Sequence, residues 1–252
     1  MIDRASIPLA RGRVAWWRRG RGGPAVDAPE TGWIRLLTAA YIWWLPALIG
    51  FALGRAAVFG VLVPFGSGFC VALAARGRAR RAAAAAIGAV IGGWAIPASV
   101  AVNVPGAPWT APVPVIGMLL ATAALQWRRW PGLAALTGAC AAGAVRVCLV
   151  LLSGGDLLAG GITAAAEIAA ALALLPAAGL FGARPGALSH GQVVSLVALT
   201  GFCLLGLKGI GWHGFALADL LARALVLLAS IVGGPGFGAA TGAGLGIAAF
   251  LA

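Results

Sequence analysis

The sequence has few charged residues and very few acidic ones. Only 10% of its 252 residues are charged and only 6 are Asp or Glu, whereas 62% are hydrophobic. One soluble core could not bury so much apolar surface, so the composition excludes a single soluble domain and indicates a membrane protein with several spans. Six dispersed carboxylates also cannot be assembled from the sequence into a divalent metal site.

Recognisable catalytic motifs are missing as well. There is no HExxH and no P-loop, and residues 66–68 read GSG, which is not the GxSxG of a serine nucleophile. The four cysteines lie inside apolar runs without CxxC or Cys/His spacing, so they are expected to be small packing residues. We therefore expect no catalytic residue, no metal and no cofactor in this chain.

The formal net charge of +12 does not indicate a nucleic-acid partner. A DNA-binding protein carries its basic groups on a water-exposed face, whereas here arginines separate apolar segments. Residues 1–32 form a basic segment rich in Gly and Pro, which we expect to be a mobile cytoplasmic tail. This tail either follows the positive-inside rule only or also binds an anionic leaflet through Trp16, Trp17 and the surrounding arginines.

The hydrophobic runs of residues 33–252 predict an all-α, polytopic transmembrane helical bundle. A hydrocarbon core of about 30 Å needs about 20 apolar residues per helix. On this basis we expect nine spans, near residues 36–53, 56–75, 82–100, 110–126, 132–152, 157–181, 192–209, 214–232 and 235–252.

The distribution of arginine predicts which connections face the cytoplasm. Short loops that hold Lys or Arg stay on the cytoplasmic side, and the basic tail places the N-terminus there too. With nine spans the even-numbered connections then hold the clusters, namely Arg76, Arg78, Arg80, Arg81, Arg128, Arg129 and Arg184. The opposite side receives only Arg55, at a tight turn, and Lys208. Nine spans leave the C-terminus outside, so a tenth span is expected beyond residue 252.

Four charged residues lie inside the expected spans and require an explanation, since each costs about 2.5–3.5 kcal/mol in a bilayer. Asp219 and Arg223 are four residues apart, the spacing of an intrahelical ion pair. Arg146 and Glu167 lie in consecutive antiparallel spans and could meet at similar depth. The four either line a pathway for protons or small ions or form two neutralising structural pairs, and we favour the structural reading.

Glycine recurs every four residues around the last span, at Gly234, Gly238, Gly242 and Gly246. This spacing predicts a groove of small residues along one helix face, which permits close helix packing. The partner helix belongs either to the same chain or to a second copy, so a homo-oligomer is a hypothesis here.

Two stretches of the chain are similar to a known family. GRAAVFGVLVPFGSGF at residues 54–69, followed by the arginine cluster, resembles the start of the membrane domain of stage II sporulation protein E. ADLLARALVLLASIVGGPGFGAATGAGLGIAAF at residues 218–250 resembles the end of that domain, and EIAAALALLP at residues 167–176 is compatible with it.

This resemblance implies a multi-pass domain of the bacterial cell membrane that places the protein at the asymmetric sporulation septum, among division-septum proteins. The family domain is described with ten helices and both ends in the cytoplasm, and a manganese-dependent serine/threonine phosphatase domain follows it. No position of this sequence matches the metal-binding aspartates of the phosphatase. We therefore expect a truncated, non-catalytic anchoring domain, with a small transporter or permease subunit that uses the buried charges as the alternative.

Overall fold

The computed structural model describes residues 32–57, 65–95, 112–181, 189–208, 210–212 and 215–250. The chain divides into two compact units, Met1–Ala39 and Ala40–Ala252. Of the first unit only the opening turns of one helix are described, so the expected tail at residues 1–32 lies almost wholly outside the described residues. The packing below concerns the second unit.

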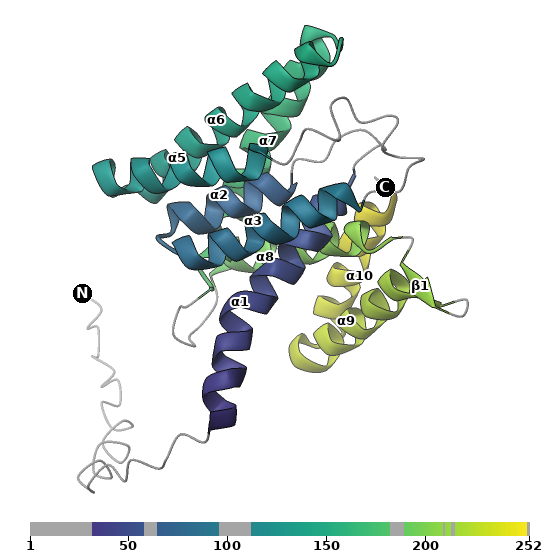
Figure 1. The fold of residues 1–252 in the computed structure, drawn as a ribbon. Coiled ribbons are helices and arrows are strands. Elements are labelled where there is room, and N and C mark those ends of the chain that lie inside the picture. Colours follow the sequence, from purple (N-terminus) through teal and green to yellow (C-terminus); the bar gives the residue numbers. More distant parts are fainter. Residues whose placement is uncertain are drawn as a thin grey trace, which may run out of the picture. The chain divides into compact units, whose positions relative to one another are not determined.

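The described residues form nine helices and one two-stranded hairpin (Figure 1). The helices are α1 (Gly32–Arg55), α2 (Phe65–Ala75), α3 (Ala79–Trp94), α5 (Pro112–Arg128), α6 (Pro131–Leu152), α7 (Leu157–Ala178), α8 (His190–Gly206), α9 (Leu217–Gly233) and α10 (Pro235–Phe250). The hairpin pairs β1 (Gly211–Trp212) with β2 (Phe215–Ala216) in antiparallel register.

The all-helical fold class is confirmed, because each expected span overlaps one of these helices and the described strands are only two residues long. Two described helices, α6 and α7, are by themselves long and apolar enough to cross a membrane. Shorter apolar helices cover Phe65–Ala75, Pro112–Gln126 and Gly191–Gly206. The number of nine spans therefore stays a prediction.

Helix α2 lies at the centre of the second unit. It contacts α3, α5, α6 and α7, and all eleven of its residues are buried. Aromatic contacts extend its surroundings, since Phe65 stacks on Phe202 of α8 at 3.8 Å and Phe69 meets the edge of Phe181 after α7 at 5.7 Å. The small residues of the sequence FGSGFCVALAA permit this enclosure, because they let neighbouring backbones approach closely.

Glycine brings α1 and α3 into backbone contact. A Cβ atom at Gly50 or Gly54 would overlap the backbone of Ala85 or Ala89 on α3. Gly88 and Gly92 face Ala47 and Phe51 of α1 in the same manner. Each helix thus contributes a GxxxG pair to the interface, the pattern that allows helices to pack closely in membranes.

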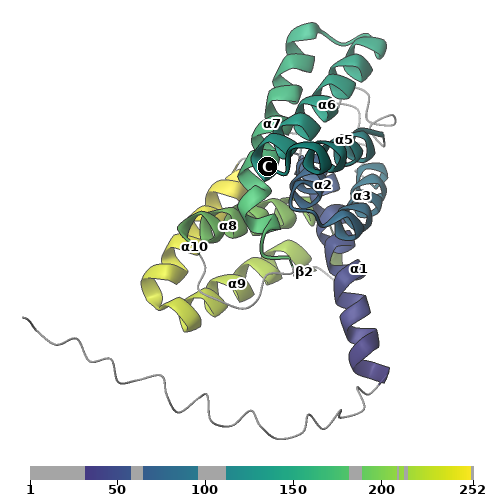
Figure 2. The ribbon, with the colours of Figure 1, turned by 90° about the vertical axis from the view of Figure 1, so that its left-hand side faces the viewer.

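The remaining helices follow one another as antiparallel neighbours. Gly117 of α5 and Gly138 of α6 face each other, and α6 and α7 form a long hairpin (Figure 2). Helix α8 packs against α7 on one side and against the α9–α10 hairpin on the other. The core therefore gathers around α2, whereas α9 and α10 join the rest of the described chain mainly through α8.

The α1–α3 interface predicts a large effect of a small substitution. Gly88→Ala places a methyl group against the backbone of Ala47, which cannot move without displacing α1, so we expect a destabilisation of about 1–3 kcal/mol. Gly161→Ala on α7 is the matched control, since no atom lies within 4 Å of its added Cβ. The thermal midpoint of the full chain in mild detergent should fall for the first variant only; equal midpoints would contradict the interface.

Candidate functional site

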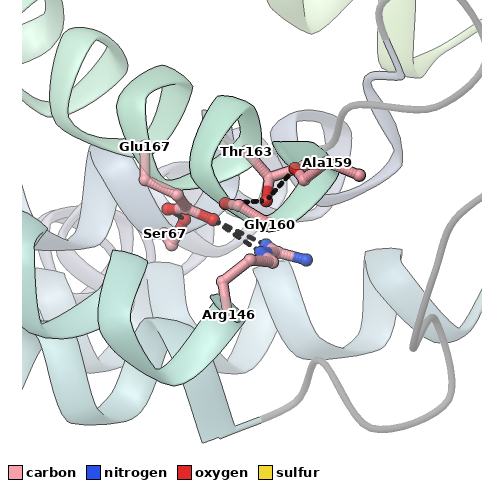
Figure 3. A network of polar contacts seen from close by, with 6 residues as sticks. All are labelled: Ser67, Arg146, Ala159, Gly160, Thr163 and Glu167. Atoms are coloured by element: carbon pink, nitrogen blue, oxygen red, sulfur yellow. Dashed lines mark hydrogen bonds and ion pairs between the residues drawn. The ribbon is translucent and has the colours of Figure 1, made fainter. Parts of the chain in front are cut away.

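A buried cluster of three polar side chains joins α2, α6 and α7. Glu167 of α7 is 1% exposed, Ser67 of α2 is 3% exposed and Arg146 of α6 is 6% exposed. Arg146 donates from Nε and Nη2 to Oε1 of Glu167 at 3.0 and 2.6 Å. The Ser67 hydroxyl donates to Oε2 of the same carboxylate, as Figure 3 shows. Both carboxylate oxygens thus have a donor.

The α6–α7 hairpin places Arg146 and Glu167 near each other. Gly143 faces Ala164 and Gly160 faces Val147, so residues 143–147 of α6 run antiparallel to residues 160–164 of α7. In that register Arg146 lies opposite a residue six positions before Glu167, an offset of about 9 Å along the helix. The long side chains of Arg146 and Glu167 together bridge this offset.

The two glycines around Ser67 bring its hydroxyl to α7. Gly66 faces Gly54 of α1 and Ala89 of α3, where an added Cβ would lie 3.0 Å from the Ala89 Cβ. Gly68 faces Ala170 of α7, where the same atom would lie 2.9 Å from the Ala170 Cβ. Close contact on both sides holds α2 so that Ser67 reaches Glu167. Residues 66–68 are thus a packing motif.

The chemistry of this cluster is electrostatic. A buried ion pair needs good geometry and further hydrogen bonds to offset the desolvation of its charges, and here Arg146 supplies two bonds and Ser67 a third. Thr163, one turn before Glu167, donates instead to the carbonyl oxygens of Ala159 and Gly160 on its own helix (Figure 3). The described residues contain no group of three or more His, Cys, Asp or Glu that could hold a metal ion.

Comparison with known proteins gives one match, to the family model described as SpoIIE, N-terminal domain, over residues 30–252. The chain belongs to the SpoIIE N-terminal domain family. No curated protein and no solved structure matches it. The resemblance found in the sequence is therefore confirmed, and the match covers all helices that carry the buried cluster of this SpoIIE N-terminal domain.

Two arginines of the SpoIIE N-terminal domain bind the carbonyl ends of distant helices. Arg55, the last residue of α1, donates from Nε to the carbonyl of Gly206 at the end of α8 at 3.0 Å, and from Nη1 to the carbonyl of Ala95 after α3. Arg76, after α2, donates from Nε to the carbonyl of Leu175 near the end of α7 at 3.2 Å. Cations are favourable at helix C-termini, so both arginines tie helix ends together.

The described arginines that are expected to set the topology lie near two neighbouring connections, α2–α3 and α5–α6. Gly77, between α2 and α3, faces Leu125 near the end of α5. This contact brings Arg76 and Arg78 of that connection, and Arg80 and Arg81 in the first turn of α3, close to Arg128 and Arg129 at the end of α5. Arg78 and Arg81 are half-buried, whereas Arg76, Arg80 and Arg129 are exposed. Arg184 lies outside the described residues.

The structure does not join Asp219 to Arg223, although it joins Arg146 to Glu167. Within the described part of α9 no ion pair connects these two side chains, and both are exposed. Asp219 lies in the first turn of α9, where a carboxylate interacts favourably with the free N–H groups of the helix start. An ion pair between exposed side chains adds little to stability, so a spacing of four residues does not by itself bring the two side chains together.

The glycine series around α10 faces α9 of the same chain over part of its length. Gly234 lies between the helices with a φ of 81°, so it is the turn residue and not part of the α10 face. A Cβ added at Gly238 would overlap the Ser230 side chain, and one added at Gly242 would lie 3.7 Å from Cγ2 of Val226. No atom lies within 4 Å of a Cβ added at Gly246. These contacts belong to the α9–α10 hairpin, and self-association stays a prediction.

Sequence reasoning missed two features of this domain. Ser67 was considered only as a nucleophile, although its position between two glycines in an apolar run is a signal for close packing. The facing GxxxG pairs at Gly50, Gly54, Gly88 and Gly92 were also visible in the sequence. In a chain with 39 glycines, spacing alone does not indicate which glycines meet.

The buried cluster predicts strongly coupled substitutions. Glu167→Gln leaves the Arg146 charge buried without its counterion and should destabilise the full chain by about 3–5 kcal/mol. The double variant Arg146→Met with Glu167→Met removes both charges and should recover most of that loss. Detergent unfolding curves measure both effects, with Asp156→Asn as a control at an exposed carboxylate. Equal losses in the single and double variants would contradict a neutralising pair.

Proposed function

We propose that this chain is a multi-pass membrane domain that anchors a SpoIIE-type phosphatase and localises it at the sporulation septum. The match of the SpoIIE N-terminal domain model over residues 30–252 is the observation that carries this proposal. In the family the membrane domain precedes the catalytic part, so the chain itself acts by placement and not by catalysis. Manganese belongs to the phosphatase domain, and no residue of this chain is proposed as its ligand.

The surface of the helices supports insertion into a bilayer. Large apolar side chains are exposed on several described helices, including Trp44, Leu48, Ile91, Leu119 and Leu228. In water such a surface would favour aggregation, whereas lipid tails solvate it.

The contacts at helix ends support the expected sidedness. Arg55 links the first, third and seventh connections, all of which have odd numbers and are expected outside. Arg76 and Gly77 link the second connection to the ends of α7 and α5, which lead to the sixth and fourth connections. Connections with the same expected side therefore meet. We infer an N-terminus in the cytoplasm and arginine clusters at the inner leaflet.

The alternative, a transporter or permease subunit, draws on the buried charge of Glu167. A carboxylate inside a membrane bundle is a functional-site hypothesis by default. Here both oxygens are bonded by Arg146 and Ser67, which favours a structural role. The anchoring function is therefore preferred, and the two functions predict different distributions in the cell.

Labelling of single cysteines tests the topology. In a full chain whose four native cysteines are replaced by alanine, Trp130→Cys lies between α5 and α6 and Ser153→Cys lies between α6 and α7. A membrane-impermeant maleimide added to intact cells should label Ser153→Cys, whereas Trp130→Cys should react only after permeabilisation. The reverse pattern would refute the inferred orientation, and labelling of both sites in intact cells would refute the span between them.

Fluorescence microscopy tests localisation. The full chain with a fluorescent protein at its N-terminus, produced in a sporulating endospore-forming bacterium, should collect at the asymmetric septum. The control is an unrelated multi-pass protein of similar length with the same tag. It measures how much brighter any membrane protein looks at the septum, where two membranes lie together. An even distribution of both proteins would contradict septal placement and favour the transporter alternative.

A further inference from the structure

Two pockets that share Leu245 form a crevice at the junction of α8, α9 and α10. The three helices lie side by side (Figure 2). The apolar half of the crevice has a volume of about 250 Å³ and is lined mainly by Leu196, Val197, Leu225 and Leu228. Its charged half has a volume of about 120 Å³ and is lined by Lys208 and Asp219 together with small residues such as Gly201 and Ala222. Leu245 of α10 borders both halves.

The two halves follow one face of each helix. The lining residues Val197, Gly201 and Leu204 of α8 and Lys208, just after its end, are three or four positions apart. On α9 the lining continues in the same manner through residues 218, 222, 225 and 229. Residues at this spacing share a helix face, so the halves form one crevice with charges at one end only.

The charged end has one cation and one anion. Lys208 follows the end of α8 and Asp219 lies in the first turn of α9, so both lie at helix ends, the level expected for lipid headgroups. Among the described residues no ion pair joins the two, although they line the same small cavity. A ligand that carries both a negative and a positive group would complement them.

We propose that this crevice binds one membrane phospholipid with a phosphate–ethanolamine headgroup. The Lys208 ammonium donates to the phosphate, the ethanolamine ammonium donates to the Asp219 carboxylate, and an acyl chain occupies the apolar half. A glycerol headgroup leaves Asp219 without a cation, and a choline headgroup has no N–H to donate. The proposal rests on the membrane insertion proposed above.

Native mass spectrometry of the full chain tests the crevice. The chain is reconstituted with equal amounts of phosphatidylethanolamine and phosphatidylglycerol and then released from a mild detergent. The wild type should retain one phosphatidylethanolamine in preference to phosphatidylglycerol. Asp219→Asn should reduce that preference about tenfold, because a charged hydrogen bond is lost. Asp156→Asn, an exposed carboxylate between α6 and α7, is the matched control and should keep it.

A second pair of variants tests the apolar half. Ala229→Phe fills the crevice and should abolish retention of both lipids, whereas Ala224→Phe, on an exposed face of the same helix, should behave as the wild type. Equal retention of the two lipids by the wild type would overturn the proposal. So would a loss of dimers in Ala229→Phe without a loss of lipid, because the occupant would then be a second copy.

Labelling of Ser153→Cys and Trp130→Cys distinguishes a failure of the lipid site from a failure of the proposed membrane insertion. Correct labelling of Ser153→Cys and Trp130→Cys together with no preference for phosphatidylethanolamine overturns the lipid site alone. Labelling that excludes a span between these residues overturns membrane insertion and the lipid site together.

Discussion

The enclosure of α2 by its neighbours is the constraint on which the rest of the arrangement depends. All eleven residues of α2 are buried, so other helices pack against every face of it. Neighbouring helices can approach it this closely only where side chains are small. Gly66 and Gly68 meet this requirement on two sides, towards α1 and α3 and towards α7.

Close packing around α2 also explains why a charge can be buried beside it. The contact at Gly68 brings Ser67 within hydrogen-bond reach of Glu167, and the α6–α7 hairpin brings Arg146 to the other carboxylate oxygen. Loss of either glycine would separate the Ser67 donor from a carboxylate that is buried. The steric and the electrostatic requirements of this core are therefore coupled, and Ser67 is the residue that links them.

Much of this fold could be predicted from the sequence, because hydrophobic runs and the positions of arginines are local signals. They can be read without knowing which helices pack together. The helices and the approach of Arg146 to Glu167 follow from such signals. Features that depend on which faces meet could not be predicted. Asp219 and Arg223 have the spacing of an ion pair, yet the structure does not pair them. Both side chains are exposed, and an ion pair between exposed side chains adds little to stability. The contact of Gly88 with Ala47 depends on how α1 and α3 are rotated relative to each other, and the spacing of glycines in the sequence does not determine that rotation.

The contacts of Arg55 have a consequence for the order in which the chain is completed. Its two carbonyl acceptors lie 40 and 151 positions later in the sequence. At a synthesis rate of about 5–20 residues per second, the end of α8 becomes available roughly 8–30 s after Arg55 itself. Throughout that interval one side of the guanidinium must be solvated by water or headgroups. The hydrogen bonds of Arg55 at the end of α1 are therefore complete only after α8 has been made.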